Sequence, residues 1–290
     1  MQIAIISPFI NTLSVSYAEG VIEHLLGLKI NVLVDRNLYE ALESPPFKEQ
    51  LTIFENLKSS TDFLICIGGD GSMLQAVAVV RDSQVPILGI NTGRLGFLTS
   101  LQKESLNKGL QLLWEKKYTL INRTLLAVDL GEFQHLLNDF PYALNEISVN
   151  RKDAASLISI KTVVDQNDLT TYWADGLIIA TPTGSTGYNL SSGGPIVLPS
   201  TPSLVMTPIA PHNLNIRPLV LPDSATISLS VSGREEHHLL SLDSRLISLP
   251  LGSSIVIKKA QFKIATVQFN DTAFYNILRE KLFWGLDKRN

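Results

Sequence analysis

The sequence predicts an α/β N-terminal domain, built on a parallel sheet with flanking helices, followed by a C-terminal all-β, sandwich-like domain. Over roughly the first 120 residues, short apolar runs alternate with stretches of helical periodicity, which is typical of a parallel sheet covered on both faces. After about residue 118, nine short β-rich segments separated by turn residues follow one another with no helix expected between them, which favours an antiparallel sandwich or a similar stack.

In the first part, the expected strands and helices alternate along the chain. Strands are expected at 2–9, 30–34, 62–68 and 85–91, and helices at 17–29, 47–57, 72–82 and 103–117. The helix at 47–57 has the weakest pattern. The helix at 103–117 has the clearest, because Leu106, Leu110, Leu113 and Trp114 form a single apolar stripe.

In the second part, strands are predicted from the alternation of apolar and polar residues. Ala225, Ile227, Leu229 and Val231 occupy one face of a predicted strand, and threonine and serine occupy the other. Near residue 272 the spacing becomes helical again, and this last helix needs a surface on which to bury its apolar residues. We therefore expect an α/β domain at 1–120, a β-rich domain at 121–270, and a C-terminal helix within 271–290 that packs back on the first domain.

Composition excludes several classes of protein. Of the 290 residues, 45% are hydrophobic and 18% are charged, which indicates a globular protein with a substantial core. The net charge of −3 provides no basic field for nucleic acid, and no apolar run approaches the roughly 18 residues of a membrane span. The single cysteine, Cys66, cannot form an intrachain disulfide. We therefore expect a cytoplasmic protein without a nucleic-acid or membrane partner.

A glycine-rich stretch with one carboxylate, Gly68-Gly69-Asp70-Gly71, lies between a predicted buried strand and a predicted helix. Ligands bind at this position in open α/β sheets, and glycines before a helix N-terminus favour an anion such as phosphate. Because Asp70 would repel phosphate, its presence indicates a chemical role next to the phosphates. It would either hold a divalent cation or accept a proton from an attacking hydroxyl. The structural alternative, with about equal weight, is that Asp70 caps the helix beginning near Ser72.

Other motifs add weaker indications. The sequence has no Walker A motif, no ordinary dinucleotide fingerprint and no zinc-hydrolase or serine-hydrolase motif. The stretch 89–100, which contains Arg94, indicates a structural turn more than a phosphate contact. The stretch 181–194, "TPTGSTGYNLSSGG", favours a polar ligand, because small hydroxyl residues and glycines allow close backbone approach.

Taken together and in this order, these stretches resemble the NAD kinase family, whose members phosphorylate the adenosine 2′-hydroxyl of NAD to give NADP. The resemblance runs through "GGDGSML", "GINTGRLGFLT", "NEIS", "DGLIIATPTGSTGYNLSSGGPI", "PHNLNIRPLVL" and "SLDSR", and covers most of residues 60–250. It implies an NAD-binding C-terminal domain, an active site between the two domains, ATP as phosphoryl donor and NAD as substrate. It also implies a divalent metal ion, expected to be Mg²⁺, and a homo-oligomer, either a tetramer or a dimer.

The resemblance also assigns roles to residues. Asp70 is the expected proton acceptor, and Gly71 is expected to help bind substrate. Asn145 and Glu146 fall on an NAD-contacting pair, and Asp175 falls on an NAD-binding aspartate. The other positions expected at the NAD pocket are Ser156, Trp173, Thr186, Gly187, Tyr188, Asn189, Leu190, Ser191, Ala210 and Arg245. No residue is assigned as a metal ligand.

Two of these positions depart from the residues frequent in the family. Trp173 stands where arginine is frequent, and Arg245 stands where glutamine is frequent. Stacking on a base would replace a charge contact at Trp173. Three alternative functions also remain open: a diacylglycerol-type lipid kinase of related fold, a non-catalytic NAD-binding sensor, and a kinase that prefers NADH.

Overall fold

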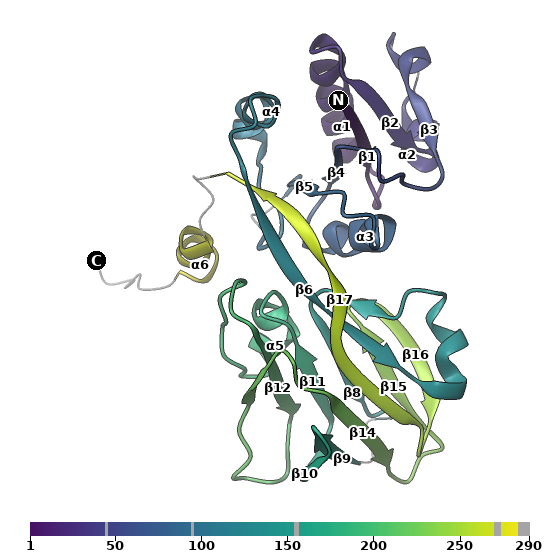
Figure 1. Cartoon of the computed structure of the whole chain (residues 1–290), viewed down its shortest axis with the longest axis vertical. Coiled ribbons are helices and arrows are strands. Elements are labelled where there is room, and N and C mark those ends of the chain that lie inside the picture. The colour runs from purple at the N-terminus through teal and green to yellow at the C-terminus, as the bar shows by residue number, and fades with distance from the viewer. Residues whose placement is uncertain (44–45, 94–95, 154–156, 270–273, 284–290) are drawn as a thin grey trace. The chain divides into compact units, whose positions relative to one another are not determined.

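The chain divides into two compact units. The computed structural model describes residues 1–43, 46–93, 96–153, 157–269 and 274–283. Unit 1 comprises Met1–Asn122 and Ile264–Asn290, and unit 2 comprises Arg123–Lys263. The chain passes between the units within two long strands, β6 (Thr119–Asp129) and β17 (Ser254–Gln268) (Figure 1).

Unit 1 is built on a parallel sheet with the strand order β3-β2-β1-β4-β5-β17. Its first five strands are β1 (Gln2–Ile6), β2 (Asn31–Asp35), β3 (Thr52–Phe54), β4 (Phe63–Ile67) and β5 (Ile87–Ile90). The chain builds outward from β1 to β3 on one side and then returns to place β4 and β5 on the other side of β1. The neighbouring strands β1 and β4 therefore form a topological switch point, the place where open α/β sheets bind ligands.

Helices cover both faces of this sheet, as expected. The helices of unit 1 are α1 (Thr12–Gly27), α2 (Arg36–Ala41), α3 (Asp70–Val80), α4 (Leu106–Trp114) and α6 (Phe274–Leu282), with short 3₁₀ turns η1 (Lys48–Gln50) and η2 (Lys103–Ser105), and the first four helices cover the sheet. The helices α1, α2 and α4 share one core cluster with residues of the strands, among them Leu88. On the opposite face, a Cβ added at Gly89 would lie 2.8 Å from the sulfur of Met73 on α3.

Two expectations for unit 1 were wrong. The segment 47–57 is not a helix: it contains η1 and β3, because Thr52, Ile53 and Phe54 pair with β2 in parallel. β-branched and aromatic residues fit such a pleated position, and the pairing outweighs a weak helical pattern. Trp114 was expected in the apolar stripe of α4, but it is 43% exposed, since only Leu110 and Leu113 face the core fully.

Unit 2 is a stack of two largely antiparallel sheets. One sheet carries β10-β9-β14-β17, with β6 paired to β17 and β7; the other has the order β13-β12-β11-β8-β15-β16. Their strands are β7 (Tyr142–Ala143), β8 (Glu146–Asn150), β9 (Ile158–Val164), β10 (Asn167–Ala174), β11 (Gly176–Ala180), β12 (Ser203–Ile209), β13 (Leu219–Pro222), β14 (Ile227–Ser232), β15 (His237–Leu242) and β16 (Arg245–Pro250).

The core of unit 2 lies between the two sheets. Residues of both sheets, such as Ile160 on β9 and Val149 on β8, join in one buried cluster. Ile227, Leu229 and Val231 belong to it, which confirms the alternation predicted for β14. The expectation that no helix interrupts these strands was wrong. The glycine- and hydroxyl-rich loop after β11 forms a 3₁₀ turn, η4 (Gly184–Thr186), and a short helix, α5 (Tyr188–Ser191), and η3 (Gly131–Leu137) follows β6.

The C-terminal helix α6 belongs to unit 1. Its residues Ile277 and Leu278 are buried, and the ring of Phe274 lies 6.3 Å from that of Phe97. Among the described residues, none of the helices combines the length and the apolar character needed to cross a membrane.

Candidate functional site

The glycine-rich loop of unit 1 lies at the switch point of the sheet, between β4 and α3. Gly68 has a φ of +144°, and a Cβ there would lie 2.0 Å from the hydroxyl of Ser72, so a larger residue does not fit. Gly69 is the N-cap residue of α3, and no side chain caps this helix end. The N-terminal end of the α3 dipole is therefore left without a side-chain partner.

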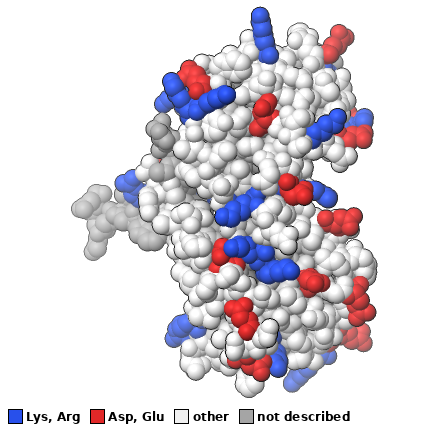
Figure 2. All heavy atoms as spheres, in the orientation of Figure 1, with Lys and Arg blue, Asp and Glu red and all other residues white. Residues whose placement is uncertain are grey.

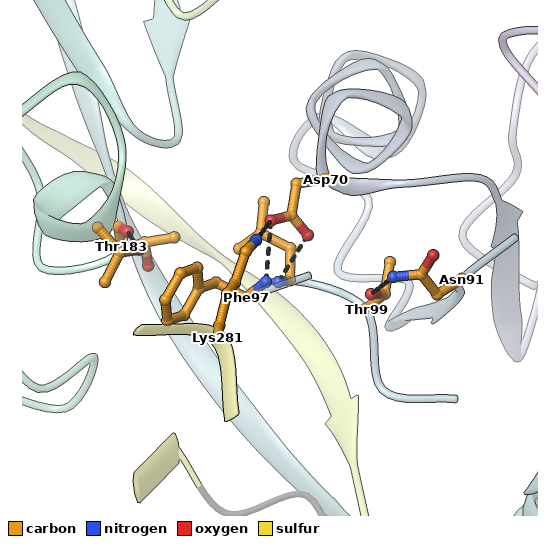
Figure 3. A network of polar contacts seen from close by, with 8 residues as sticks. Asp70, Asn91, Phe97, Thr99, Thr183 and Lys281 are labelled. Carbon is orange, nitrogen blue, oxygen red and sulfur yellow. Dashed lines mark hydrogen bonds and ion pairs between the residues drawn. The ribbon is translucent and has the colours of Figure 1, made fainter. Parts of the chain in front are cut away.

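Asp70 is held by backbone amides from the loop after β5. The N–H of Phe97 donates to Oδ2 at 2.8 Å, and the N–H of Leu98 donates to Oδ1 at 3.0 Å (Figure 3). The Nζ of Lys281 lies 3.5 Å from Oδ2. The capping interpretation of Asp70 was therefore wrong, since its carboxylate turns away from its own helix and toward this loop.

The loop after β5 is shaped to receive this carboxylate. A Cβ at Gly96 would lie 2.0 Å from Oδ1 of Asp70, so only glycine allows the approach. The buried side chain of Asn91 ties the loop together, because its Nδ2 donates to the hydroxyl of Thr99 at 3.0 Å (Figure 3). Its Oδ1 accepts from the N–H of Gly93 at 2.7 Å. Arg94, which the sequence had suggested as a weak phosphate contact, lies outside the described residues.

In unit 2, a partly buried aspartate organises the segment that contains Asn145 and Glu146. Asp243 follows β15 in a two-residue turn and has a φ of +53°. Its carboxylate accepts from the backbone N–H groups of Leu144, Asn145 and Glu146 at 2.9, 2.7 and 3.2 Å. Burial raises the pKa of Asp243, and these three hydrogen bonds oppose that rise. Sequence reasoning missed Asp243, although it lies within the "SLDSR" stretch that supported the family resemblance.

Glu146 lies beside Asp243 without a full set of partners. It is 9% exposed, and its Oε2 has no hydrogen-bond partner among the described residues. Burial and the charge of Asp243 raise the pKa of Glu146 to about 8, while the backbone N–H of Tyr188 lowers it. A Cβ at Gly187 would lie 3.1 Å from this oxygen, so Glu146 lies against the start of α5. A buried carboxyl oxygen of this kind is suited to accept a ligand hydroxyl.

The loop after β11 packs tightly on the Asn145 segment. The hydroxyl of Thr181 donates to the carbonyl of Leu144 at 2.6 Å and accepts from the N–H of Gly184 at 3.1 Å. A Cβ at Gly184 would lie 2.0 Å from the carbonyl oxygen of Asn145, so glycine is required there. The turn η4 and the helix α5 are thereby fixed beside Asn145 and Glu146.

Asn189 holds this loop from inside. Its side chain is fully buried, and its Nδ2 donates to the carbonyls of Ser185 and Pro195, both at 3.0 Å. Its Oδ1 accepts from the hydroxyl of Thr207 at 2.6 Å. All of these contacts are internal, so the side chain of Asn189 supports the loop. By contrast, Tyr188 is 42% exposed, and Ser191 also faces solvent.

A second group of expected residues gathers at the other end of β11. Trp173 is 55% exposed, and its carbonyl accepts from the N–H of His212 at 2.8 Å. Asp175 forms an ion pair with Arg151 at 2.9 Å, and its N–H donates to the carbonyl of Ile209 at 3.0 Å, next to the exposed Ala210. Along β11, Gly176 pairs with β8 at Asn150, whereas Ala180 pairs at Glu146. Asp175 precedes Gly176, so the group around it lies about 16 Å along the strand from Glu146.

Arg245 is engaged with the protein. Its guanidinium donates to the carbonyls of Phe140, at 2.6 Å, and Tyr142, and lies 4.8 Å from the centre of the Phe140 ring. Burial lowers its pKa, and Asp243 opposes this. Ser156 lies outside the described residues.

The structure thus brings the expected residues into three groups. Asp70 and Gly71 lie in unit 1, while unit 2 holds one group around Glu146 and another around Asp175. Among the described residues, no three His, Cys, Asp or Glu side chains gather closely enough to hold a metal ion by themselves.

Comparison with known proteins places these groups in one family. Residues 3–118 match the ATP-NAD kinase N-terminal domain, and residues 144–269 match the ATP-NAD kinase C-terminal domain. An NAD kinase of Christiangramia forsetii is 45% identical, and one of Flavobacterium johnsoniae is 44% identical, each over the full length of both chains.

Solved structures agree with this match. A yeast NADH kinase complexed with NADH has a TM-score of 0.86 at 28% identity, covering 99% of this chain and 89% of the yeast chain. An NAD kinase from Archaeoglobus fulgidus in complex with ATP has a TM-score of 0.74 at 25% identity, covering 98% of this chain and 99% of the other. None of these matches favours a lipid kinase or a non-catalytic sensor. The chain belongs to the NAD kinase family.

Proposed function

We propose that the protein transfers the γ-phosphoryl group of ATP to the 2′-hydroxyl of the adenosine ribose of NAD, producing NADP. The observation that carries this proposal is the position of Asp70, a carboxylate at the switch point of the sheet that two backbone amides orient. Family membership over the whole chain supports the identity of both substrates.

Asp70 accepts the proton of the attacking hydroxyl. Each of its oxygens receives one backbone N–H; Oδ2 also accepts from the Nζ of Lys281 at 3.5 Å, whereas Oδ1 retains a lone pair for a ligand hydroxyl. The transition state of phosphoryl transfer is loose, so catalysis rests mainly on positioning, and general-base help contributes about 10²- to 10⁴-fold.

The glycine loop and the start of α3 bind the phosphates of ATP. Gly71 has open space on its solvent side, since a Cβ there would find its nearest neighbour, a ring carbon of Phe9, at 3.9 Å. Mg²⁺ usually binds through one or two carboxylates together with substrate phosphates, and Asp70 fits such a site. When bound, the ion would neutralise charge on the phosphates.

Unit 2 binds NAD. Glu146 and Asn145 contact its hydroxyl and amide groups beside Thr186, Gly187, Tyr188, Leu190 and Ser191, with the fully buried Asn189 supporting this loop. Trp173, Asp175 and Ala210 form a second contact region, in which the exposed indole of Trp173 stacks on a base. Ser156 and Arg245 complete the proposed set.

The protein works in the cytoplasm as a homo-oligomer, a dimer or tetramer, without a nucleic-acid or membrane partner. On the face drawn in Figure 2, Lys and Arg side chains are interspersed with Asp and Glu. The net charge is −3, whereas nucleic-acid-binding proteins generally have an excess of basic residues gathered in a patch.

One assay tests the proposed activity. Purified protein with ATP, Mg²⁺ and NAD should form NADP, read by a coupled enzyme that uses only the phosphorylated cofactor. The same assay with NADH in place of NAD measures the preference between the redox forms. Absence of NADP and NADPH formation with well-folded protein would refute the proposal.

Replacing Asp70 by asparagine should lower kcat by about 10²- to 10⁴-fold, because the amide cannot accept the proton. The amide group would also face one of the two backbone N–H donors, so the unfolding midpoint must be measured alongside. NAD affinity should stay within about threefold of wild type. The control is Asp82→Asn, an exposed carboxylate in the same unit, which should keep full activity. If Asp70→Asn keeps activity within a few-fold, Asp70 is not the base.

Gly71→Ala should separate stability from binding. Gly71 lies in the first turn of α3 with no close neighbour, so alanine should leave stability unchanged or raise it by up to about 1 kcal/mol. The added methyl group should raise the KM for ATP at least tenfold, because it occupies the space assigned to phosphate. Thermal melts and steady-state kinetics measure the two effects. An unchanged KM would remove Gly71 from the phosphate site.

The raised pKa of Glu146 predicts that the protein loses stability as pH rises. A carboxyl group whose pKa is about 8 in the folded protein and about 4.5 in the unfolded chain stabilises the native state when it is protonated, so its contribution to stability declines as pH rises from about 4.5 through 8. Relative to wild type, Glu146→Gln should therefore gain roughly 3 kcal/mol of stability between pH 5 and 8. Denaturant unfolding of both proteins at several pH values measures the difference between their free energies of unfolding. The contributions of the other titrating groups are the same in both proteins and cancel in this difference. The control variant Glu236→Gln, at an exposed glutamate, should show no such gain. If the stability difference between Glu146→Gln and wild type does not change with pH, the raised pKa of Glu146 is contradicted.

A further inference from the structure

The C-terminal helix α6 places a cation beside Asp70. The Nζ of Lys281 lies 3.5 Å from Oδ2 of Asp70 and 4.5 Å from the centre of the Phe97 ring (Figure 3). The Lys281 side chain is 35% exposed and that of Asp70 is 31% exposed, so both reach solvent. A ligand that approaches Asp70 therefore meets the ammonium group of Lys281 as well.

The position of this lysine is built into unit 1. Ile277 and Leu278 are buried, and Phe274 packs against Phe97 with ring centres 6.3 Å apart. Phe97 also supplies a backbone N–H to Asp70. Phe97, one of the two residues that orient the carboxylate, thus also contacts the helix that carries the cation, so the two charged groups are positioned together.

The proposed reaction requires a cation at this place. A triphosphate carries several negative charges, and Asp70 adds another within the same small region. The loop "GGDGSML" contains no basic residue, unlike the phosphate loops that carry their own lysine. Among the ion pairs of the described residues, Asp70 has Lys281 as its cationic partner. Lysine is an effective point-charge ligand for phosphate.

We propose that Lys281 binds the triphosphate group of the phosphoryl donor. The inference rests on the proposed function, which places that group beside Asp70. An ammonium group has three donors, so Lys281 retains donors for phosphate oxygens while one points to Asp70. It thereby screens the phosphates from the carboxylate that accepts the proton. The lysine that the glycine loop lacks is supplied from the far end of the chain.

The test measures binding of a non-hydrolysable ATP analogue, AMP and NAD by calorimetry. Lys281→Met should lower the affinity for the ATP analogue about tenfold, equivalent to about 1.4 kcal/mol, and change the affinities for AMP and NAD by less than twofold. The affinity of Lys281→Met for inorganic tripolyphosphate should fall by the same factor, since the contact is with phosphate and not with adenosine. Lys281→Arg should restore most of the affinity, because it keeps the charge. Lys281→Gln provides a second neutral variant with a polar side chain.

Arg279→Met is the matched control. It removes the same charge from the same helix, but the Arg279 guanidinium contacts Asn276 and lies exposed. Its affinity for the ATP analogue should equal that of wild type. Melting temperatures of all variants show whether α6 remains packed.

Three results would overturn the inference: unchanged binding of the ATP analogue by Lys281→Met, an equal loss for AMP and the ATP analogue, or an equal loss in Arg279→Met. The proposed function is tested separately by NADP formation in the wild-type protein. An active wild type with unchanged analogue binding in Lys281→Met removes only the role of Lys281. An inactive wild type whose variants show the expected binding pattern removes the NAD kinase activity and keeps the phosphate site.

Discussion

Two hydrogen bonds from the loop after β5 to the carboxylate of Asp70 determine what unit 1 can do. They join residues 27 and 28 positions apart and require that no side chain stands at Gly96. Without them, an aspartate in the first turn of a helix would be free to interact with its own helix end. With them, the carboxylate is held toward the edge of the sheet where α3 begins, and the remaining lone pair of its Oδ1 is available to a ligand. The rest of the proposed chemistry depends on this orientation.

Unit 2 uses carboxylates in two opposite ways. Asp243 is partly buried and receives three backbone N–H bonds, so it acts as a structural centre for the Asn145 segment. Glu146 is buried, yet one of its oxygens has no partner among the described residues. A protein does not leave a buried acceptor unpaired without a cost of about 1–3 kcal/mol. A ligand hydroxyl would remove that cost, and for this reason Glu146 is the better candidate for binding and Asp243 for support.

The sequence predicts those features that depend on local pattern. The buried strand before Gly68, the helix after it and the alternation of β14 all follow from periods of 2 and 3.6 residues, and all three are confirmed. The features that were missed depend on partners far along the chain. The strand at Thr52–Phe54 forms because it pairs with β2; Asp243 meets Asn145 from 98 positions away; Arg245 finds the carbonyl of Phe140 from 105 positions away. No window of residues contains such partners, so periodicity cannot reveal them.

The glycines of the site show most clearly what composition alone leaves undetermined. Glycine-rich loops suggest flexibility, yet Gly96, Gly184 and Gly194 are needed because a Cβ would lie 2.0 Å from a polar atom of Asp70, Asn145 or Asn189. They let polar groups approach closely. Gly69 has no neighbour within 4 Å of such a Cβ, and Gly71 has only a ring carbon of Phe9 at 3.9 Å. The fold places no steric demand for glycine at these two positions, so the space beside them is available to a ligand. The sequence does not distinguish these two kinds of glycine. Only the atoms around each glycine show whether the fold requires it for a close contact or whether it leaves space for phosphate.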